Sequence, residues 1–252
     1  MAPDAIDVVT LRLYGGLTWF APDADRDGHV EVPIAASRSV KDLVESAGVP
    51  HVEVGRLVVE GATVHFDEVV RGPCRVAVYP VSGDLDDPDL RPAVTDPVRF
   101  VADVHLGALA RRLRTLGFDT WWQRDADDDE LAARSEADGR ALLSRDRGLL
   151  MRRVVVHGYC PRSDVPDEQV VEVIGRFDLR RRARPFTRCV TCNGILDPVA
   201  KQDVWDALPP RTRVDHDDFA RCRDCGQVFW PGSHHAAMTA WMGDLFGSDP
   251  EA

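Results

Sequence analysis

The sequence predicts an α/β protein with a small strand-rich N-terminal module, a central domain with a mostly parallel sheet and a cysteine-bearing C-terminal region. Its 252 residues exceed the roughly 100–200 residues of an ordinary single domain. Strand and helix patterns alternate over residues 98–184, which is typical of βαβ units around a parallel sheet. Two C-x-x-C pairs follow. We therefore expect domains at residues 1–83, 98–184 and 185–252, with an acidic, proline-containing linker at 84–97.

The N-terminal module alternates apolar and polar residues in "VVTLRLYG" and "HVEVPI", the period of half-buried strands. A helix is predicted over "SVKDLVESAG", where Ser39 and Asp42 have the spacing of a capping box and Gly48 marks the exit. Strand patterns return in "RLVVEG" and "CRVAVYPV". Strands around one helix predict a β-grasp module, which resembles the ubiquitin-like sulfur carriers in pattern and length. Those carriers need a free Gly-Gly end, whereas this chain runs on into another domain, so we expect a docking or positioning role.

The net charge of −11 is concentrated near the N-terminus. Residues 1–90 hold 7 basic and 16 acidic side chains, whereas residues 91–252 are almost neutral and rich in arginine, which binds phosphate bidentately. An RNA partner for the second region therefore stays open, and the acidic module is a candidate surface for a protein partner. No apolar run approaches the roughly 18 residues of a membrane span and no secretory signal is predicted, so we expect a cytoplasmic protein without a membrane partner.

Aspartates are predicted at the carboxyl ends of two strands of the central sheet. "RFVAD" ends on Asp103, and "ALLSRD" ends on Asp146. A third acidic stretch, residues 125–130, opens a helix, and its Asp128 is placed to cap that helix and point inward. Ligands of open parallel sheets bind at this edge, and carboxylates gather there most readily around a hard cation. We expect a Mg²⁺ or Mn²⁺ site; the alternative is that each aspartate only caps a helix.

The helix after Asp103 combines an apolar stripe with arginines. Leucines at helical spacing are expected to face the core: Leu106, Leu109, Leu113 and Leu116. Arg111 and Arg114 fall away from this stripe, and Arg145 precedes Asp146, so all three are candidates to bind substrate phosphate. The alternatives are a solvated face for the two helix arginines and an ion pair for Arg145.

Four cysteines form the C-terminal pairs "RCVTCNG" and "RCRDCGQ": Cys189, Cys192, Cys222 and Cys225. Asn193, Gly194 and Gly226 tolerate the tight turns that let backbone N–H groups point at thiolates. Four thiolates leave no open position on Zn²⁺, so we expect a zinc ribbon with a structural metal, and a redox dithiol is the alternative for one pair. The surrounding arginines are candidates for an RNA-binding strip or an ordinary solvated surface.

Three stretches resemble the Mut-seven C-terminal RNase family, a branch of the PIN-like nucleases that a ubiquitin-like module often precedes: "FVADVHLGALARRLRTLGFDT", "DDELAARSEADGRALLSRDRGLL" and "DEQVVEVIGRFDL". The resemblance implies a PIN-like fold whose acidic metal-binding positions are Asp103, Asp128 and Asp146. It also places Arg111 and Arg114 in the matching "LARRLR" helix. The family often has Thr before the Arg-Asp pair, where this chain has Ser144 and keeps the hydroxyl. The fourth acid common in PIN nucleases has no assigned position here.

The favoured interpretation is a metal-dependent ribonuclease that hydrolyses phosphodiester bonds of tRNA or another structured RNA. Its catalytic Mg²⁺ or Mn²⁺ would be held by the three aspartates, and its structural Zn²⁺ by the four cysteines. One alternative is a noncatalytic RNA-binding or ribosome-associated factor that uses the same fold. Another is a zinc-ribbon adaptor whose main partner is a protein engaging the acidic module.

Overall fold

The computed structural model describes residues 7–83 and 86–246 and divides into two compact units. The first unit contains the chain up to His105 together with Gln123–Arg162, and the second contains Leu106–Trp122 and the chain from Ser163 onward. Residues 1–6 of the expected N-terminal module, residues 84 and 85 of the expected linker, and residues 247–252 lie outside the described residues.

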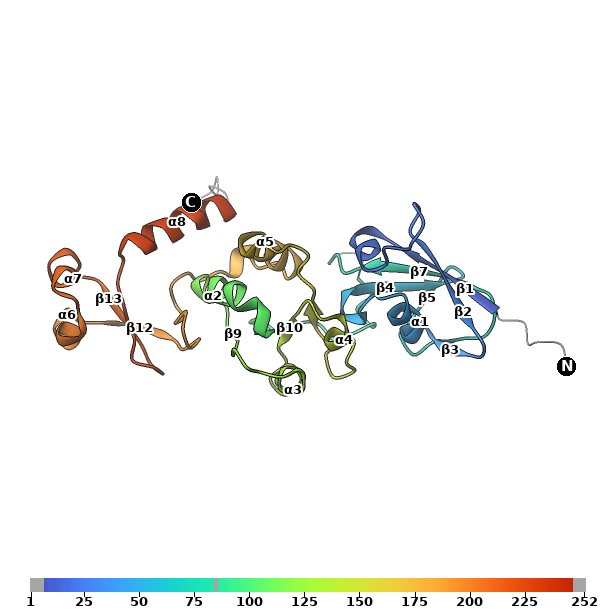
Figure 1. The fold of residues 1–252 in the computed structure, drawn as a ribbon, viewed down its shortest axis with the longest axis horizontal. Coiled ribbons are helices and arrows are strands. Elements are labelled where there is room, and N and C mark those ends of the chain that lie inside the picture. The colour runs from blue at the N-terminus through green and yellow to red at the C-terminus, as the bar shows by residue number, and fades with distance from the viewer. Residues whose placement is uncertain (1–6, 84–85, 247–252) are drawn as a thin grey trace. The chain divides into compact units, whose positions relative to one another are not determined.

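The first unit begins with a five-stranded sheet in the order β2-β1-β7-β4-β5 (Figure 1). Its strands are β1 (Asp7–Leu13), β2 (His29–Ile34), β4 (Val54–Val59), β5 (Ala62–Val64) and β7 (Arg75–Pro80). β1 and β7 pair in parallel, and the remaining neighbours pair antiparallel. Shorter elements complete this part: η1 (Gly15–Phe20), η2 (His51–Glu53), and the ladder of β3 (Arg38–Ser39) with β6 (Val69–Val70). This is the β-grasp architecture expected.

Helix α1 (Val40–Ser46) begins where the capping pattern predicts it. The Ser39 hydroxyl accepts a hydrogen bond from the backbone N–H of Asp42 at 3.1 Å. The chain leaves the helix through Gly48 at φ +88°, a conformation that favours glycine. The helix buries Val40 and Leu43 completely, so its apolar face belongs to the core of this part.

The first unit also holds a parallel sheet, in which β10 (Ala141–Leu143) lies between β8 (Phe100–Ala102) and β11 (Gly158–Tyr159). Every residue of β8 and β10 is buried, which is typical of central parallel strands. Helices α3 (Asp128–Asp138) and α4 (Arg147–Leu150) accompany this sheet. Gly139 ends α3 in the left-handed conformation, as its position predicts.

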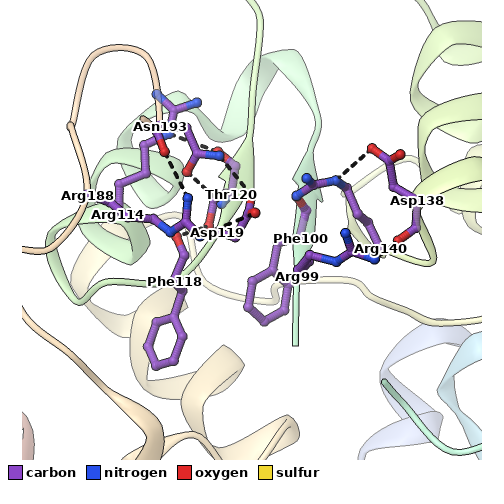
Figure 2. Close-up of polar contacts among 10 residues, drawn as sticks. All are labelled: Arg99, Phe100, Arg114, Phe118, Asp119, Thr120, Asp138, Arg140, Arg188 and Asn193. Carbon is purple, nitrogen blue, oxygen red and sulfur yellow. Dashed lines mark hydrogen bonds and ion pairs between the residues drawn. The ribbon is translucent and has the colours of Figure 1, made fainter. Parts of the chain in front are cut away.

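Arg140 ties the end of α3 to the start of this sheet (Figure 2). Its guanidinium contacts the Asp138 carboxylate at 3.0 Å and donates to the Phe100 carbonyl at 3.2 Å. The hydrogen bond and charge of Arg140 lower the pKa of Asp138. The helix end and the β8 strand are therefore held by one side chain.

The two units divide within η3 (Val104–Leu106). The second unit contains α2 (Gly107–Thr115), β9 (Thr120–Trp121), α5 (Pro166–Arg176) and η4 (Arg180–Arg182). The predicted leucine stripe is confirmed, since all four members are at most 3% exposed: Leu106, Leu109, Leu113 and Leu116. Helix α5 contributes Val170 and Val173, both fully buried, to the same unit.

The C-terminal part of the second unit is a three-stranded antiparallel sheet in the order β12-β13-β14. Its elements are β12 (Leu196–Val199), β13 (Phe219–Cys222), β14 (Val228–Phe229), α6 (Lys201–Val204), η5 (Trp205–Ala207), α7 (Pro210–Asp215) and α8 (Ser233–Phe246). Its core cluster consists of Val204, Leu208 and Phe219. Such a small core calls for additional stabilisation, for example a bound metal. Within the described ranges, no helix has the length and apolar character that a bilayer crossing requires.

Candidate functional site

The carboxyl ends of β8 and β10 bring Asp103 and Asp146 onto one hydrogen-bonded edge. Asp103 directly follows β8, and its backbone N–H donates to the Leu143 carbonyl at 2.9 Å, which continues the pairing with β10. The fully buried Ser144 hydroxyl donates to Asp103 Oδ2 at 2.6 Å. The same hydroxyl oxygen accepts the backbone N–H of Asp146 at 2.9 Å. Ser144 therefore connects the two strand ends that carry the aspartates.

Asp103 and Asp146 lie in different environments. Asp103 is only 6% exposed, so its carboxylate is held in the direction that Ser144 sets. Asp146 is exposed and caps α4, with Oδ1 accepting the Leu149 backbone N–H at 3.2 Å. Capping and metal binding are compatible for this residue, because a carboxylate can accept several interactions at once.

The acidic run at the start of α3 differs from expectation in one respect. The helix cap is Asp127, whose Oδ1 accepts the Glu130 backbone N–H at 2.8 Å, so the expectation that Asp128 caps the helix is wrong. Asp128 is one residue inside the helix and lies 3.8 Å from Arg152, which also binds Asp129 at 2.5 Å. The hydrogen bond that Arg152 donates to the Asp129 carboxylate raises the pKa of Arg152. Arg152 was not predicted as part of this region, because no local sequence pattern pairs it with α3.

The structure links two of the three predicted aspartates to each other but not the third. Among the residues that the structure describes, one set of three or more His, Cys, Asp or Glu side chains has its ligand atoms within 4.8 Å of one another, and it consists of the four C-terminal cysteines. None of the three aspartates belongs to this set; Ser144 joins Asp103 to Asp146, whereas Asp128 contacts Arg152. A hollow of about 440 Å³ is lined by Gly139, Arg140 and His157, at the start of β10 and away from its carboxyl end.

The predicted substrate-binding arginines divide into two kinds. Arg111 and Arg145 are exposed. Arg114 is 2% exposed, and its guanidinium donates to the carbonyls of Thr120, Val190 and Thr191 at 2.8, 3.1 and 3.0 Å. The expectation that Arg114 binds substrate is therefore corrected, because its donors are engaged inside the protein.

The four cysteines form a set that suits a tetrahedral metal. Cys189 and Cys225 have their Sγ atoms 3.8 Å apart, and Cys192 and Cys222 have theirs 3.4 Å apart. Zinc–sulfur bonds of about 2.3 Å place tetrahedral sulfurs about 3.8 Å apart. The cluster thus has the size and ligand type that Zn²⁺ needs.

The surroundings of the cluster shift the pKa values of two of its thiols in opposite directions. Burial raises the pKa of Cys222, but the backbone N–H groups of Cys225 and Asp224 and the hydrogen bonds of Cys192 and Cys225 outweigh it, and the pKa falls to about 7. Burial raises the pKa of Cys192 to about 12. Four close thiols titrate as a set, so a cation would be needed to stabilise four thiolates together.

The first cysteine turn is fastened to the α2 and β9 segment of its unit (Figure 2). Arg114 binds the carbonyls of the two residues between Cys189 and Cys192. Asn193, at φ +73°, accepts the Thr120 backbone N–H at 2.9 Å and donates to Asp119 at 2.8 Å. The positive φ of Asn193 was predicted, but its contacts with Thr120 and Asp119 were not, because they join residues more than 70 positions apart.

Within the first unit, the β-grasp part is hydrogen-bonded to the parallel-sheet part through residues that sequence patterns did not single out. Glu53, 4% exposed, binds both terminal nitrogens of Arg162 at 3.0 Å and accepts the Cys160 backbone N–H at 2.7 Å. His51 lies 2.8 Å from the Val155 carbonyl. Arg147, the residue after Asp146, donates to the Phe20 carbonyl at 2.6 Å.

Sequence comparison agrees with the order of the parts. The sequence profile of the Mut7-C RNAse domain matches residues 98–242, and that of the Mut7-C ubiquitin domain matches residues 6–86. No curated protein shows significant similarity to the chain. The RNAse profile covers more than half of the 252 residues and includes both the strand-end aspartates and the cysteine cluster. The chain therefore belongs to the Mut7-C RNase family and carries the ubiquitin-like domain in front of the RNase domain.

Proposed function

We propose that this protein is a metal-dependent ribonuclease that hydrolyses phosphodiester bonds in a structured RNA such as tRNA. The observation that carries the proposal is the link between two aspartates on neighbouring parallel strands. Asp103 directly follows β8, Asp146 lies in the turn after β10, and the buried hydroxyl of Ser144 joins them. Membership of an RNase family supports the same reaction class. We further propose that the RNase domain has a PIN-like fold over residues 98–184, followed by a zinc ribbon from residue 185.

The chain's own residues have distinct roles in this proposal. Asp103 and Asp146 would hold Mg²⁺ or Mn²⁺, which prefer oxygen ligands, with Asp128 as a third contributor from α3. Ser144 positions Asp103 and keeps its carboxylate from rotating away from the edge. When bound, such cations activate a water molecule and stabilise the leaving oxygen. The exposed Arg111 and Arg145 would contact substrate phosphates.

The test is RNA cleavage and Mn²⁺ binding by the full chain and by single variants. Asp103→Asn and Asp146→Asn should each lower cleavage of purified tRNA at least about 100-fold, because several kcal/mol of charge stabilisation would be lost. Mn²⁺ binding, followed by electron paramagnetic resonance, should weaken in parallel. Asp128→Asn and Asp129→Asn form a matched pair, since both carboxylates contact Arg152. A loss confined to Asp128→Asn supports a metal role for that residue, whereas equal effects argue against one.

A second candidate function is a noncatalytic RNA-binding or ribosome-associated factor. It is favoured by the spacing of the acids, because within the described part of the chain no third carboxylate joins Asp103 and Asp146 at ligand distance. RNA binding without cleavage, unchanged in the Asp103→Asn variant, would select this candidate. A protein partner for the acidic N-terminal domain remains a separate prediction. Its test is to delete this domain and to measure whether binding of the partner is lost.

A further inference from the structure

An exposed tryptophan in the ubiquitin-like domain is held in a fixed orientation. Trp19 lies in η1 and is 42% exposed, although a large indole is usually covered. The ring of Phe20, only 1% exposed, meets it edge to face, with centroids 5.1 Å apart and planes at 87°. The indole therefore rests on the core and offers aromatic surface to solvent.

Two arginines of the RNase-domain part of the same unit approach this indole. The guanidinium carbon of Arg147 lies 5.2 Å from the Trp19 ring centroid, and that of Arg162 lies 5.5 Å away. Both arginines are fixed, Arg147 by the Phe20 carbonyl and Arg162 by the Glu53 carboxylate. Arg147 directly follows Asp146 in the chain. An aromatic ring and two guanidinium groups thus lie together, and one of these guanidinium groups belongs to the residue that directly follows Asp146.

We propose that Trp19 is a stacking platform for an unpaired base of the RNA whose backbone reaches the Asp103 and Asp146 edge. This makes the ubiquitin-like domain part of the substrate-binding surface, and it rests on the proposed function. Bases stack on aromatic rings and on guanidinium planes, and single-stranded RNA is recognised mostly in this way. The guanidinium of Arg147 beside Trp19 adds positive charge to this surface, which favours RNA over an apolar protein partner.

The acidic character of the ubiquitin-like domain shapes what this surface can bind. Asp23, Asp25 and Asp27 follow η1 and disfavour a general phosphate-binding patch there. Stacking does not depend on neutralising phosphates, so the contribution of Trp19 to affinity should change little with salt. The platform therefore suits an exposed loop or end of a folded RNA better than a continuous duplex.

The experiment measures RNA binding in the full chain carrying Asp103→Asn, so that cleavage does not interfere. The probe is a short fluorescein-labelled oligouridine, compared with the same strand paired to oligoadenosine, by fluorescence anisotropy. Trp19→Leu should weaken binding of the single strand about 5- to 100-fold and leave duplex binding nearly unchanged. Trp19→Phe should retain most of the affinity, because it keeps an aromatic face.

The matched control is Trp205→Leu in the other unit. Trp205 is 45% exposed and lies 5.1 Å from the Arg213 guanidinium, so it reproduces the exposed tryptophan–arginine pair in a part of the chain outside the ubiquitin-like domain. The proposal requires that Trp205→Leu change the affinity for the single strand by no more than about twofold. Equal single-strand affinity for the parent and Trp19→Leu, or equal loss for Trp19→Leu and Trp205→Leu, would overturn it.

A second measurement uses protein in which Trp19 is intact, so that its result does not depend on whether Trp19→Leu folds correctly. Oligouridine containing 4-thiouridine, irradiated with the Asp103→Asn chain, should crosslink to the peptide that contains Trp19. Crosslinks found only elsewhere contradict the platform. The failure of the proposed function can be told apart from the failure of this inference. If the unsubstituted protein binds single-stranded RNA through Trp19 but does not cleave it, the stacking platform is supported and the nuclease function is rejected.

Discussion

Arg114 shows how burial decides the role of a single charged side chain. On the helix surface it would attract phosphate, but it is almost fully enclosed and donates to carbonyls on both sides of it. Burial lowers the pKa of Arg114, and the nearby Cys189, Cys192 and Asp119 act in the opposite direction. The planar guanidinium presents five N–H donors in a rigid fork, whereas the lysine ammonium presents three donors from a single nitrogen.

Arg114→Lys should lower the free energy of unfolding by about 2–4 kcal/mol, because carbonyls of the first cysteine turn lose charged hydrogen bonds. Zinc should also be released faster to a chelator, since Val190 and Thr191 lie between two of the cysteines. Urea unfolding and metal release with a colorimetric chelator measure the two effects. Arg111→Lys, on the exposed side of the same helix, is the control and should change neither quantity. Identical zinc release from both variants would contradict this coupling.

At the scale of elements, the two cysteine turns use glycine for different reasons. Gly194 needs space, because a Cβ there would lie 2.7 Å from Cys222 Sγ and 2.5 Å from Asp224 Oδ2. Gly226 needs conformational freedom, because its φ is +73° while no atom lies within 4 Å of an added Cβ. The two pairs look alike in sequence, yet one turn is limited by packing and the other by backbone geometry.

Gly194→Ala should weaken Zn²⁺ binding at least about tenfold, because the methyl group displaces a ligand sulfur from its tetrahedral position. Gly226→Asn should bind Zn²⁺ nearly as tightly as the parent, since asparagine tolerates a positive φ. Competition with a chelator gives the affinity, and the thiolate–Co²⁺ absorption of the cobalt form reports the geometry. The explanation fails if Gly226→Asn is the more damaging substitution.

At the scale of the whole molecule, the ubiquitin-like domain is connected to part of the RNase domain by a buried ion pair in the first unit. Burial alone would lower the pKa of Arg162, but the hydrogen bonds and charge of Glu53 outweigh burial and raise it. The pair therefore favours a charged Arg162. Because removing one partner of a buried pair leaves the other uncompensated, this contact should couple the stabilities of the two parts.

Glu53→Gln should destabilise the first unit by about 2–4 kcal/mol, somewhat less than a fully buried pair because Arg162 is partly exposed. Differential scanning calorimetry should show a lower Tm or a separate transition for the ubiquitin-like domain. Asp197→Asn is the matched control, since it breaks an Arg–carboxylate pair that is exposed on both sides and should cost under about 1 kcal/mol. Equal shifts in Tm for both variants would show that burial does not make the Glu53 pair more stabilising than an exposed pair.

Much of the fold was predictable because its determinants are local. The period of apolar residues predicts the leucine stripe of α2, and the Ser39 cap and Gly139 exit mark helix ends that the structure confirms. The local pattern places Asp103 directly after its strand, whereas Asp146 lies three residues beyond the end of β10, where it caps α4. The close spacing within each cysteine pair likewise predicted the turns that gather the four thiols.

The sequence by itself determined the order of the parts, the strand ends that carry carboxylates and the cysteine turns, because backbone periodicity and short spacings encode them. Only the tertiary structure decided that Arg114 faces inward, that Ser144 joins two aspartates and that Asp127 rather than Asp128 caps α3. The fold also brings Arg162 into contact with Glu53, which is 109 positions away in the sequence, and places it beside Trp19. The physical reason is that the role of a polar side chain depends on its burial and its partners, and chain folding brings those partners from distant segments.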